Sequence, residues 1–431
     1  MIRRARPATR WPATLLVAVA LLAGCAGPAI PTAQGPGLSP SSSASSASSA
    51  PSAGPGATSE ELVPEEAGER APRLLQTASR REEAREQEEV RQRVRKRAER
   101  RARATAENPL EARTWGVYQG PREPTSAPYL RATGATKQAL AKIALEPKAA
   151  WFGAWIGDDE IAGEVEEYIA GTQQGDPEAL VQMTVFRMVP WEHEACRRLP
   201  TEAEKASYRR WIDSFAAAVG ATPTAIVLQP DGPFALCAPG GPAVPAALVA
   251  YASRVLSALP RTSVYIEVGA GDWPAPGQGG VAEVLRFLLP AGIEDARGIA
   301  LNGTHYSATE IEVERGAAIV EALADRGIAG KKVVIDTSAN GNPFPFGTYT
   351  GPDPDNAFVC TSPADQRTCV TLGIPPTTEV ADPAWGLSEQ ARADAREHVD
   401  AYLWFGRPWL YRQNTPFVME RALGLARSTP Y

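Results

Sequence analysis

Residues 224–232 read TAIVLQPDG and residues 262–273 read TSVYIEVGAGDW, and these two stretches decide the fold. Each starts as a run of apolar residues, several of them β-branched, and ends in a turn that carries carboxylates. Apolar side chains at successive positions leave no polar face, which is typical of strands buried on both sides of a parallel sheet. We therefore expect a parallel sheet whose two faces are both covered.

Similar apolar runs recur along the chain and predict seven strands, at 149–156, 181–189, 224–230, 262–268, 298–302, 331–336 and 401–406. Amphipathic stretches between them predict crossover helices, among them 201–219, 243–258, 308–326 and 388–399. About seven such units fit a closed barrel better than a doubly wound sheet, and no Gly-rich phosphate loop follows the first strand. The sequence thus predicts an α/β fold, a distorted parallel (β/α) barrel of the TIM-like kind, over residues 110–431.

The first 25 residues indicate export. Arginines precede an apolar run of about a dozen residues, which suits a signal peptide and is too short to cross a bilayer. The run ends in Leu22-Ala23-Gly24-Cys25, which resembles the lipobox of bacterial lipoproteins. A lipidated Cys25 would hold the protein on the extracytoplasmic face of the cell membrane. The alternative is an ordinary secretory signal with a chance cysteine.

Two further segments separate this signal from the barrel. Residues 26–78 are rich in Ser, Ala, Pro and Gly and predict a disordered linker. Residues 79–106 are rich in Arg and Glu at i,i+4 spacing and predict a charged helical spacer. The basic end of that helix could instead touch anionic cell-wall polymers or lipid headgroups.

Charge and cysteine content narrow the functional classes. The formal net charge of −6 comes without a basic stripe in the barrel region, so we expect no nucleic-acid partner. Three scattered histidines argue against a catalytic zinc, and we expect neither a metal nor a cofactor. We also expect the protein to be a monomer. Four cysteines remain besides Cys25, and an exported chain is expected to pair them. Of three possible pairings we favour the two sequence-local disulfides, Cys196–Cys237 and Cys360–Cys369.

Polar and aromatic residues collect after the predicted strands, where parallel barrels hold their functional groups. A glycosidic bond needs an acid and a base on either side, and aromatic faces stack on sugar rings. The residues in these positions that we predict as site residues are Asp231, Glu267, Asp272, Trp273, Asn302, His305, Asp336, Trp404 and Trp409. Trp191, Glu192, His193 and Glu194 follow the second strand and join the candidates.

The same segments resemble glycoside hydrolase family 6, the inverting cellulase family, in shared order over roughly 280 residues. AIVLQPD is similar to the family strand that ends in Ile-Glu-Pro-Asp, which implies that Asp231 is the general acid. YIEVGAGDW resembles Tyr-Leu-Asp-Ala-Gly-His-Ala-Gly-Trp, which implies a carboxylate role for Glu267 and a sugar-binding role for Trp273. RGIALNGTHYSAT and VVIDTSANG match further segments and imply binding roles for Asn302 and Asp336.

The chain also departs from the family pattern. The family follows its last strand with Lys-Pro-Pro-Gly-Glu-Ser-Asp-Gly, whose Asp is the proposed base, whereas residues 406–413 read GRPWLYRQ. With the register set at Cys196, Ala195 stands where the family has the Asp that tunes the acid, and Glu194 lies one residue away. Phe186 stands where the family has a ring-distorting Tyr. The water-orienting carboxylate then comes from Glu267, Asp272, Glu192 or Glu194.

Three interpretations follow: an inverting glycosidase that cleaves β-1,4-glucan, an enzyme reshaped for a related polysaccharide, or a glycan-binding protein without catalysis. Each of these carboxylates could instead have a purely structural role. Asp231 could cap a helix, Glu267 could pair with an arginine such as Arg297, and Asp272 could stabilise a turn.

Overall fold

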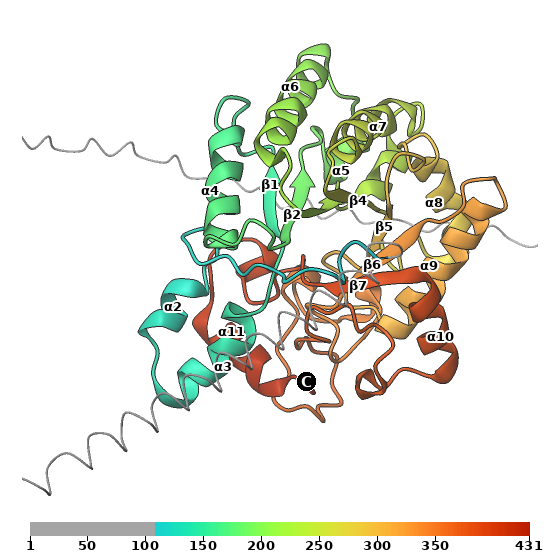
Figure 1. The fold of residues 1–431 in the computed structure, drawn as a ribbon. Helices are drawn as coiled ribbons and strands as arrows, with labels where there is room; N and C mark the ends of the chain where they lie inside the picture. Colours follow the sequence, from blue (N-terminus) through green and yellow to red (C-terminus); the bar gives the residue numbers. More distant parts are fainter. Residues whose placement is uncertain (1–107) are drawn as a thin grey trace, which may run out of the picture. The chain divides into compact units, whose positions relative to one another are not determined.

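The structure is a computed structural model that describes residues 108–431. The predicted signal peptide, lipobox cysteine, linker and charged helix therefore lie outside the described residues. The described part follows one alternating pattern of strands and helices from β1 to α11 (Figure 1).

Seven parallel strands form one sheet in the order of the sequence. They are β1 (Ala150–Gly153), β2 (Val181–Phe186), β3 (Thr224–Leu228), β4 (Thr262–Glu267), β5 (Gly298–Leu301), β6 (Lys332–Asp336) and β7 (Val399–Leu403). All seven coincide with predicted strands. β7 begins two residues earlier than expected because α10 passes directly into it.

The sheet curls until its two edge strands meet. Ala149, just before β1, donates its backbone N–H to the carbonyl oxygen of Trp404, just after β7, at 2.9 Å. The Trp151 indole N–H reaches the carbonyl of Phe405 at 2.6 Å. These contacts close a distorted barrel at a β1–β7 seam, which confirms the predicted fold class.

Helices cover the outside of the barrel. In Figure 1, α4 (Ile161–Gln173), α6 (Glu202–Val219), α7 (Ala243–Ser257), α8 (Gly280–Leu288), α9 (Thr309–Ala324) and α10 (Glu389–His398) follow one another around the strands. α2 (Ser126–Arg131), α3 (Gly134–Ala144) and α11 (Met419–Ser428) lie together at one side. None of the helices in residues 108–431 combines the length and the apolar character needed to span a bilayer.

The strands bury both faces, as their sequence pattern predicts. On β3, Ile226 and Leu228 pack outward against the helices, whereas Ala225 and Val227 belong to an inner cluster with Tyr265. The alternation follows from the two-residue period of a strand. The inner cluster borders a polar network in which Asp400 accepts hydrogen bonds from Tyr265 and Arg297.

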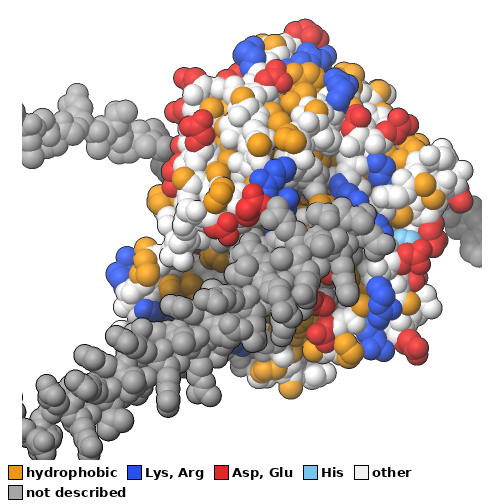
Figure 2. Space-filling model, viewed as in Figure 1, with side chains coloured by type: hydrophobic (Ala, Val, Ile, Leu, Met, Phe, Trp, Pro, Cys, Tyr) orange, Lys and Arg blue, Asp and Glu red, His pale blue; other side chains and the backbone are white. Residues whose placement is uncertain are grey.

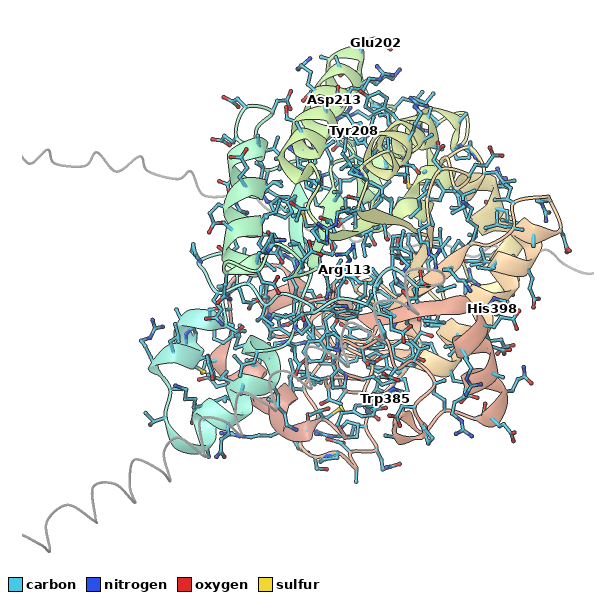
Figure 3. The ribbon with its side chains drawn as sticks, in the orientation of Figure 1. Arg113, Glu202, Tyr208, Asp213, Trp385 and His398 are labelled. Carbon is cyan, nitrogen blue, oxygen red and sulfur yellow. A yellow bond between two sulfur atoms is a disulfide. The ribbon has the colours of Figure 1, made fainter. Side chains whose placement is uncertain are left out.

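The surface carries charges of both signs. Figure 2 shows acidic and basic side chains interspersed over the face in view. Figure 3 locates several of them, with Glu202 and Asp213 on α6 and His398 at the end of α10. His398 therefore lies in the helix that the sequence predicted over residues 388–399.

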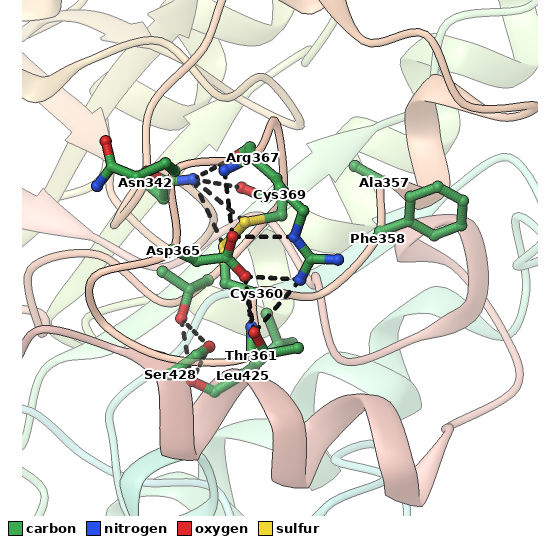
Figure 4. Close-up of a disulfide and its surroundings, with 12 residues drawn as sticks. Asn342, Ala357, Phe358, Cys360, Thr361, Asp365, Arg367, Cys369, Leu425 and Ser428 are labelled. Carbon is green, nitrogen blue, oxygen red and sulfur yellow. Dashed lines mark hydrogen bonds and ion pairs between the residues drawn. A yellow bond between two sulfur atoms is a disulfide. The ribbon is translucent and has the colours of Figure 1, made fainter.

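Both predicted disulfides are present. Cys196 pairs with Cys237 and Cys360 pairs with Cys369, across 41 and 9 positions of sequence. The second bond closes a short loop that Asn342 braces by donating to the Arg367 carbonyl at 2.9 Å (Figure 4). Cys360, Cys369 and Asp365 also form a group of potential metal ligands in the described part, but the disulfide removes the thiolates that a metal would need.

Candidate active site

Asp231 lies at the C-terminal end of β3, where the chain turns into the short 3₁₀ helix η1 (Gly232–Cys237). Its backbone is left-handed, with φ 60°. Such a conformation costs conformational energy that the surrounding structure must offset. It is found most often at functional sites, where a particular backbone geometry is needed. The residue borders a small depression of about 30 Å³, which is room for one or two water molecules and is also lined by Phe186, Trp191 and Glu192.

The surroundings of Asp231 favour its protonated form. Burial raises the pKa of its carboxyl to about 7, and the nearby charges of Glu192 and Asp355 push in the same direction, while His305 opposes them. A carboxyl group with such a pKa holds its proton at mildly acidic pH, which is what a general acid requires.

The negative charges of Glu192 and Asp355 raise the pKa of Asp231. Glu192 begins α5 (Glu192–Ala195) after β2, and Asp355 belongs to the short helix η4 (Pro354–Asn356) in the long loop after β6. Both residues lie at the protein surface, where neighbouring groups shield their carboxyl groups in part. Partial burial raises the pKa of each, and Asp355 raises the pKa of Glu192 further. Asp231 and Glu192 thus line the depression, and the charge of Asp355 acts on both of them from a third loop.

Glu194 points to a different environment. Its Oε1 accepts a hydrogen bond from Arg198 at 2.9 Å, in an ion pair on the protein surface. Glu192, two residues earlier, is the carboxylate of this segment that acts on Asp231. The catalytic role predicted for Glu194 stays a prediction that this ion pair does not favour.

Glu267 is buried beneath Asp231, with 1% of its surface exposed. Its two carboxylate oxygens accept the backbone N–H groups of Gly269 and Gly232, at 2.8 and 3.3 Å. Burial and the charge of Asp231 raise the pKa of Glu267 well above its usual value. Glu267 thus fixes the turn that carries Asp231, and its catalytic role stays a prediction. Arg297, its expected alternative partner, binds Asp400 instead.

Asp272 and His305 form an ion pair beside the site. Asp272 Oδ1 lies 2.8 Å from His305 Nδ1, and Oδ2 accepts the backbone N–H of Phe346 at 2.6 Å. Burial opposes ionisation of Asp272, but these hydrogen bonds outweigh it and lower its pKa. Burial likewise opposes protonation of His305, and Asp272 outweighs it and raises the pKa of the imidazole. The pair therefore favours an ionised Asp272 and a charged His305.

α9 holds the loop that carries this pair. Glu312, which is fully buried, accepts the backbone N–H of Gly271 at 2.6 Å. Arg315, one turn later, donates to the carbonyl of Pro274 at 2.8 Å. The two contacts bracket Asp272 and Trp273 and fix their position.

Aromatic rings line the C-terminal ends of the strands on both sides of Asp231. On one side, Phe186 lies 5.5 Å from Trp151 and 5.4 Å from Trp191 between ring centroids. On the other side, Trp273 lies 5.0 Å from Phe234 and stacks on His305 at 5.8 Å. Trp155 and Trp191 are 60% and 42% exposed, and Trp273 is half-buried. Exposed aromatic faces flanking an acid are suited to hold a row of sugar rings.

Four predicted binding residues are buried at the β5–β7 side. Asn302 binds the backbone of Ser307 and the carbonyl of Asp336. Asp336 accepts the backbone N–H groups of Ser338 and Gly406, at 2.8 and 2.6 Å. Trp404 and Trp409 are only 2% and 1% exposed. These contacts hold the strand ends together, and a sugar contact of any of the four stays a prediction.

Sequence reasoning missed Asp355, Glu312 and Phe234. Asp355 lies in the stretch PDPDN (352–356), which carries the signals of an ordinary turn. Glu312 occupies an amphipathic helix in which a glutamate is expected to face solvent. Phe234 follows Asp231 by three residues and offered a signal, because it lies in the same strand-end loop.

Comparisons with known proteins find one family model and several similar chains. The family model of glycosyl hydrolases family 6 matches residues 117–408. Endoglucanase A from Cellulomonas fimi is 30% identical over 229 residues, which are 53% of this chain and 47% of that protein. Endoglucanase 1 from Streptomyces sp. (strain KSM-9) is 30% identical over 238 residues, which are 54% of this chain and 61% of that protein. This chain thus spans about half the length of the first of these relatives and three fifths of the second.

Solved structures show the same fold. The endoglucanase Cel6 from Mycobacterium tuberculosis, in complex with methyl-cellobiosyl-4-deoxy-4-thio-β-D-cellobioside, superposes with a TM-score of 0.55 and 26% identity. The superposition covers 74% of this chain and 98% of that one. The endoglucanase CEL6B from Humicola insolens has a TM-score of 0.52 at 16% identity, covering 74% and 97% of the two chains, which speaks for the fold alone.

Proposed function

The chain belongs to glycosyl hydrolases family 6, and on that premise we propose that it is an inverting glycosidase that cleaves β-1,4-glucan or a related polysaccharide. The observation that carries the proposal is Asp231, a carboxyl group with a pKa raised to about 7 between two sets of aromatic rings. The relatives named as endoglucanases support the substrate class.

In the proposed reaction, Asp231 donates its proton to the glycosidic oxygen as the bond to the sugar breaks. A second carboxylate orients a water molecule toward the opposite face of the sugar. Glu192 and Asp355 are the candidates, because their charges act on Asp231 and they come from loops on either side of it. Either group would act in its ionised form while Asp231 stays protonated.

The choice between Glu192 and Asp355 as the water-orienting carboxylate can be tested. Inversion requires about 6.5–9.5 Å between the two carboxyl groups, so that a water molecule fits. Replacement of the water-orienting carboxylate by its amide, in Glu192→Gln or Asp355→Asn, is expected to lower kcat by about 10²-fold or more. Added azide, a nucleophile that needs no deprotonation, should restore turnover to that variant alone.

A glycan-binding protein without catalysis is the second candidate. It is favoured by residues 406–413, which lack the carboxylate that the resemblance leads one to expect there. The deciding experiment incubates the purified protein with a panel of β-glucans and cell-wall polysaccharides and measures reducing sugar, with calorimetry in parallel. Sugar release supports the enzyme, and binding without release supports the second candidate. If the protein neither releases sugar nor binds a polysaccharide, both candidates are refuted.

We also propose that the protein is anchored at the outer face of the cell membrane through a lipidated Cys25. The support is the lipobox-like sequence at residues 22–25. A Cys25→Ala variant should move from the detergent phase to the aqueous phase on phase separation, and retention in the detergent phase would contradict the anchor. Light scattering of the same variant tests the expected monomer.

A further inference from the structure

A cavity of about 260 Å³ lies at the β1–β7 seam, and we call it the seam cavity. Its wall includes Trp151 and Trp155 from the β1 side and Arg407 and Trp409 from the segment after β7. The volume falls just under the roughly 300–1,000 Å³ of small-ligand pockets, which suits one sugar unit rather than a chain.

Arg407 lines this cavity without an ion-pair partner among residues 108–431. Its backbone N–H donates to Gln413, but its guanidinium makes no hydrogen bond and no ion pair within residues 108–431, and its Nε is buried. The guanidinium carbon lies 4.5 Å from the ring centroid of Trp151. Burial lowers the pKa of Arg407 to about 10 against the opposing effect of the Glu123 charge, so the side chain is still charged at neutral pH.

The other charged side chains that line the seam cavity are occupied. Lys148 Nζ lies 3.6 Å from Glu123 and also donates to the carbonyl of Glu146. Glu123 accepts the backbone N–H of Thr125 at 3.0 Å. Arg122 pairs with glutamates of α4. Burial raises the pKa of Glu146, which weakens its tendency to carry a negative charge. A positive charge is therefore left over at Arg407.

A half-buried guanidinium without a hydrogen-bond partner is costly, and a planar anion satisfies it best, because two parallel N–H groups match the two oxygens of a carboxylate. Indole faces beside it suit the apolar face of a sugar ring. We propose that the seam cavity is a subsite for an acidic sugar unit whose carboxylate binds Arg407. The substrate would then be an anionic β-glycan.

Phe186 packs against rings of the seam cavity and also borders the depression beside Asp231. That ring lies 5.5 Å from Trp151 and 6.5 Å from Trp155, and it also lines the depression beside Asp231. A glycan lying along these rings would present one unit to the seam cavity and another to the acid. The inference rests on the proposed function, because it names the substrate class of the same cleft.

The test compares two probes that differ only in charge: a β-1,4-linked glucose oligosaccharide, and the same oligosaccharide with C6 oxidised to a carboxylate. Calorimetric Kd and kcat/KM are measured for the full chain and for Arg407→Gln, Arg407→Lys and Arg326→Gln. Arg326 is an exposed cation just after α9 that donates to the Ala322 carbonyl, so its loss makes the same change in net charge away from the seam.

We expect the parent to prefer the acidic probe, and Arg407→Gln to lower that preference by about tenfold to hundredfold, the range given by losing one charge-assisted hydrogen bond. Arg407→Lys should keep part of the preference, and Arg326→Gln all of it. A preference that survives in Arg407→Gln, or a parent that cuts both probes equally well, overturns the inference and leaves the proposed function standing. If neither probe is bound or cut, both fall together. Thermal unfolding of each variant shows whether a loss reflects misfolding.

Discussion

Removal of the Cys196–Cys237 disulfide should harm both stability and catalysis, whereas removal of Cys360–Cys369 should harm stability alone. Cys196 follows α5, which begins with Glu192, and Cys237 ends the helix that starts directly after Asp231. The bond therefore ties together the two loops that carry the proposed acid and one candidate water-orienting carboxylate. The other disulfide closes a loop braced by Asn342.

The magnitudes follow from the lengths of the closed loops. In the chain-entropy model, a bond across 41 positions contributes about 4 kcal/mol to the free energy of unfolding, and a bond across 9 positions about 2.6 kcal/mol. The Cys196→Ala/Cys237→Ala double variant should thus lose about 1.4 kcal/mol more than the Cys360→Ala/Cys369→Ala variant. A displacement of about 1 Å between Asp231 and Glu192 should lower kcat/KM by up to about 10²-fold in the first variant.

The assay is guanidinium unfolding of both double variants, together with hydrolysis rates at a temperature where each is fully folded. The reasoning predicts a larger loss of stability and a selective loss of activity in the first variant. Equal activity in the two variants would show that the disulfide does not align the site. An equal loss of stability would show that loop length does not set the contribution of these bonds.

Four further predictions concern pH, packing and binding. Turnover should fall about tenfold between pH 6 and pH 8, because Asp231 with a pKa of about 7 must be protonated; a fall only above pH 9 would exclude it as the acid. The melting temperature should also fall over this range. Burial raises the pKa of Asp336 and of Glu312 to about 7 in the folded state, so the stabilisation that these groups provide below their unfolded-state pKa values is lost as the pH rises through 7. A melting temperature that rises instead would contradict this. Gly406→Ala should lower the free energy of unfolding, measured with denaturant, by about 1–3 kcal/mol, because the new Cβ would meet Asp336 and Ser338. Gly347→Ala, with open space around its Cβ, should change it by no more than about 0.5 kcal/mol. Equal losses in the two variants would refute the clash. Trp273→Ala should raise KM about tenfold with kcat less affected, and an unchanged KM would remove it from the sugar cleft.

The sequence was sufficient for the barrel because its strands are read locally. Ala225, Ile226, Val227 and Leu228 are all apolar, and only a strand covered on both faces accepts that pattern. The position of Asp231 at a strand end followed from the same pattern. The favoured pairing of the cysteines rested on their proximity in sequence, and the structure has that pairing.

The electrostatics of the site required three dimensions. The charge of Asp355 acts on Asp231 from a long loop without a periodic pattern, so nothing in its local sequence distinguishes Asp355 from a turn residue. Glu267 looked like a catalytic partner, yet two backbone N–H groups occupy its oxygens. Nothing in the local sequence of Arg407 shows that its buried Nε finds no hydrogen-bond partner among residues 108–431, because that depends on neighbours from distant parts of the chain.

The measurement that tests the account most directly is the dependence of the Asp231→Ala variant on the leaving group. A natural β-glucan needs protonation of its glycosidic oxygen, whereas an aryl glycoside that releases 2,4-dinitrophenolate does not. If Asp231 is the general acid, the variant will lose about 10²-fold or more in kcat/KM on the glucan and retain most of its activity on the aryl substrate. Equal losses on the two substrates, or undiminished cleavage of the glucan, would contradict the central claim.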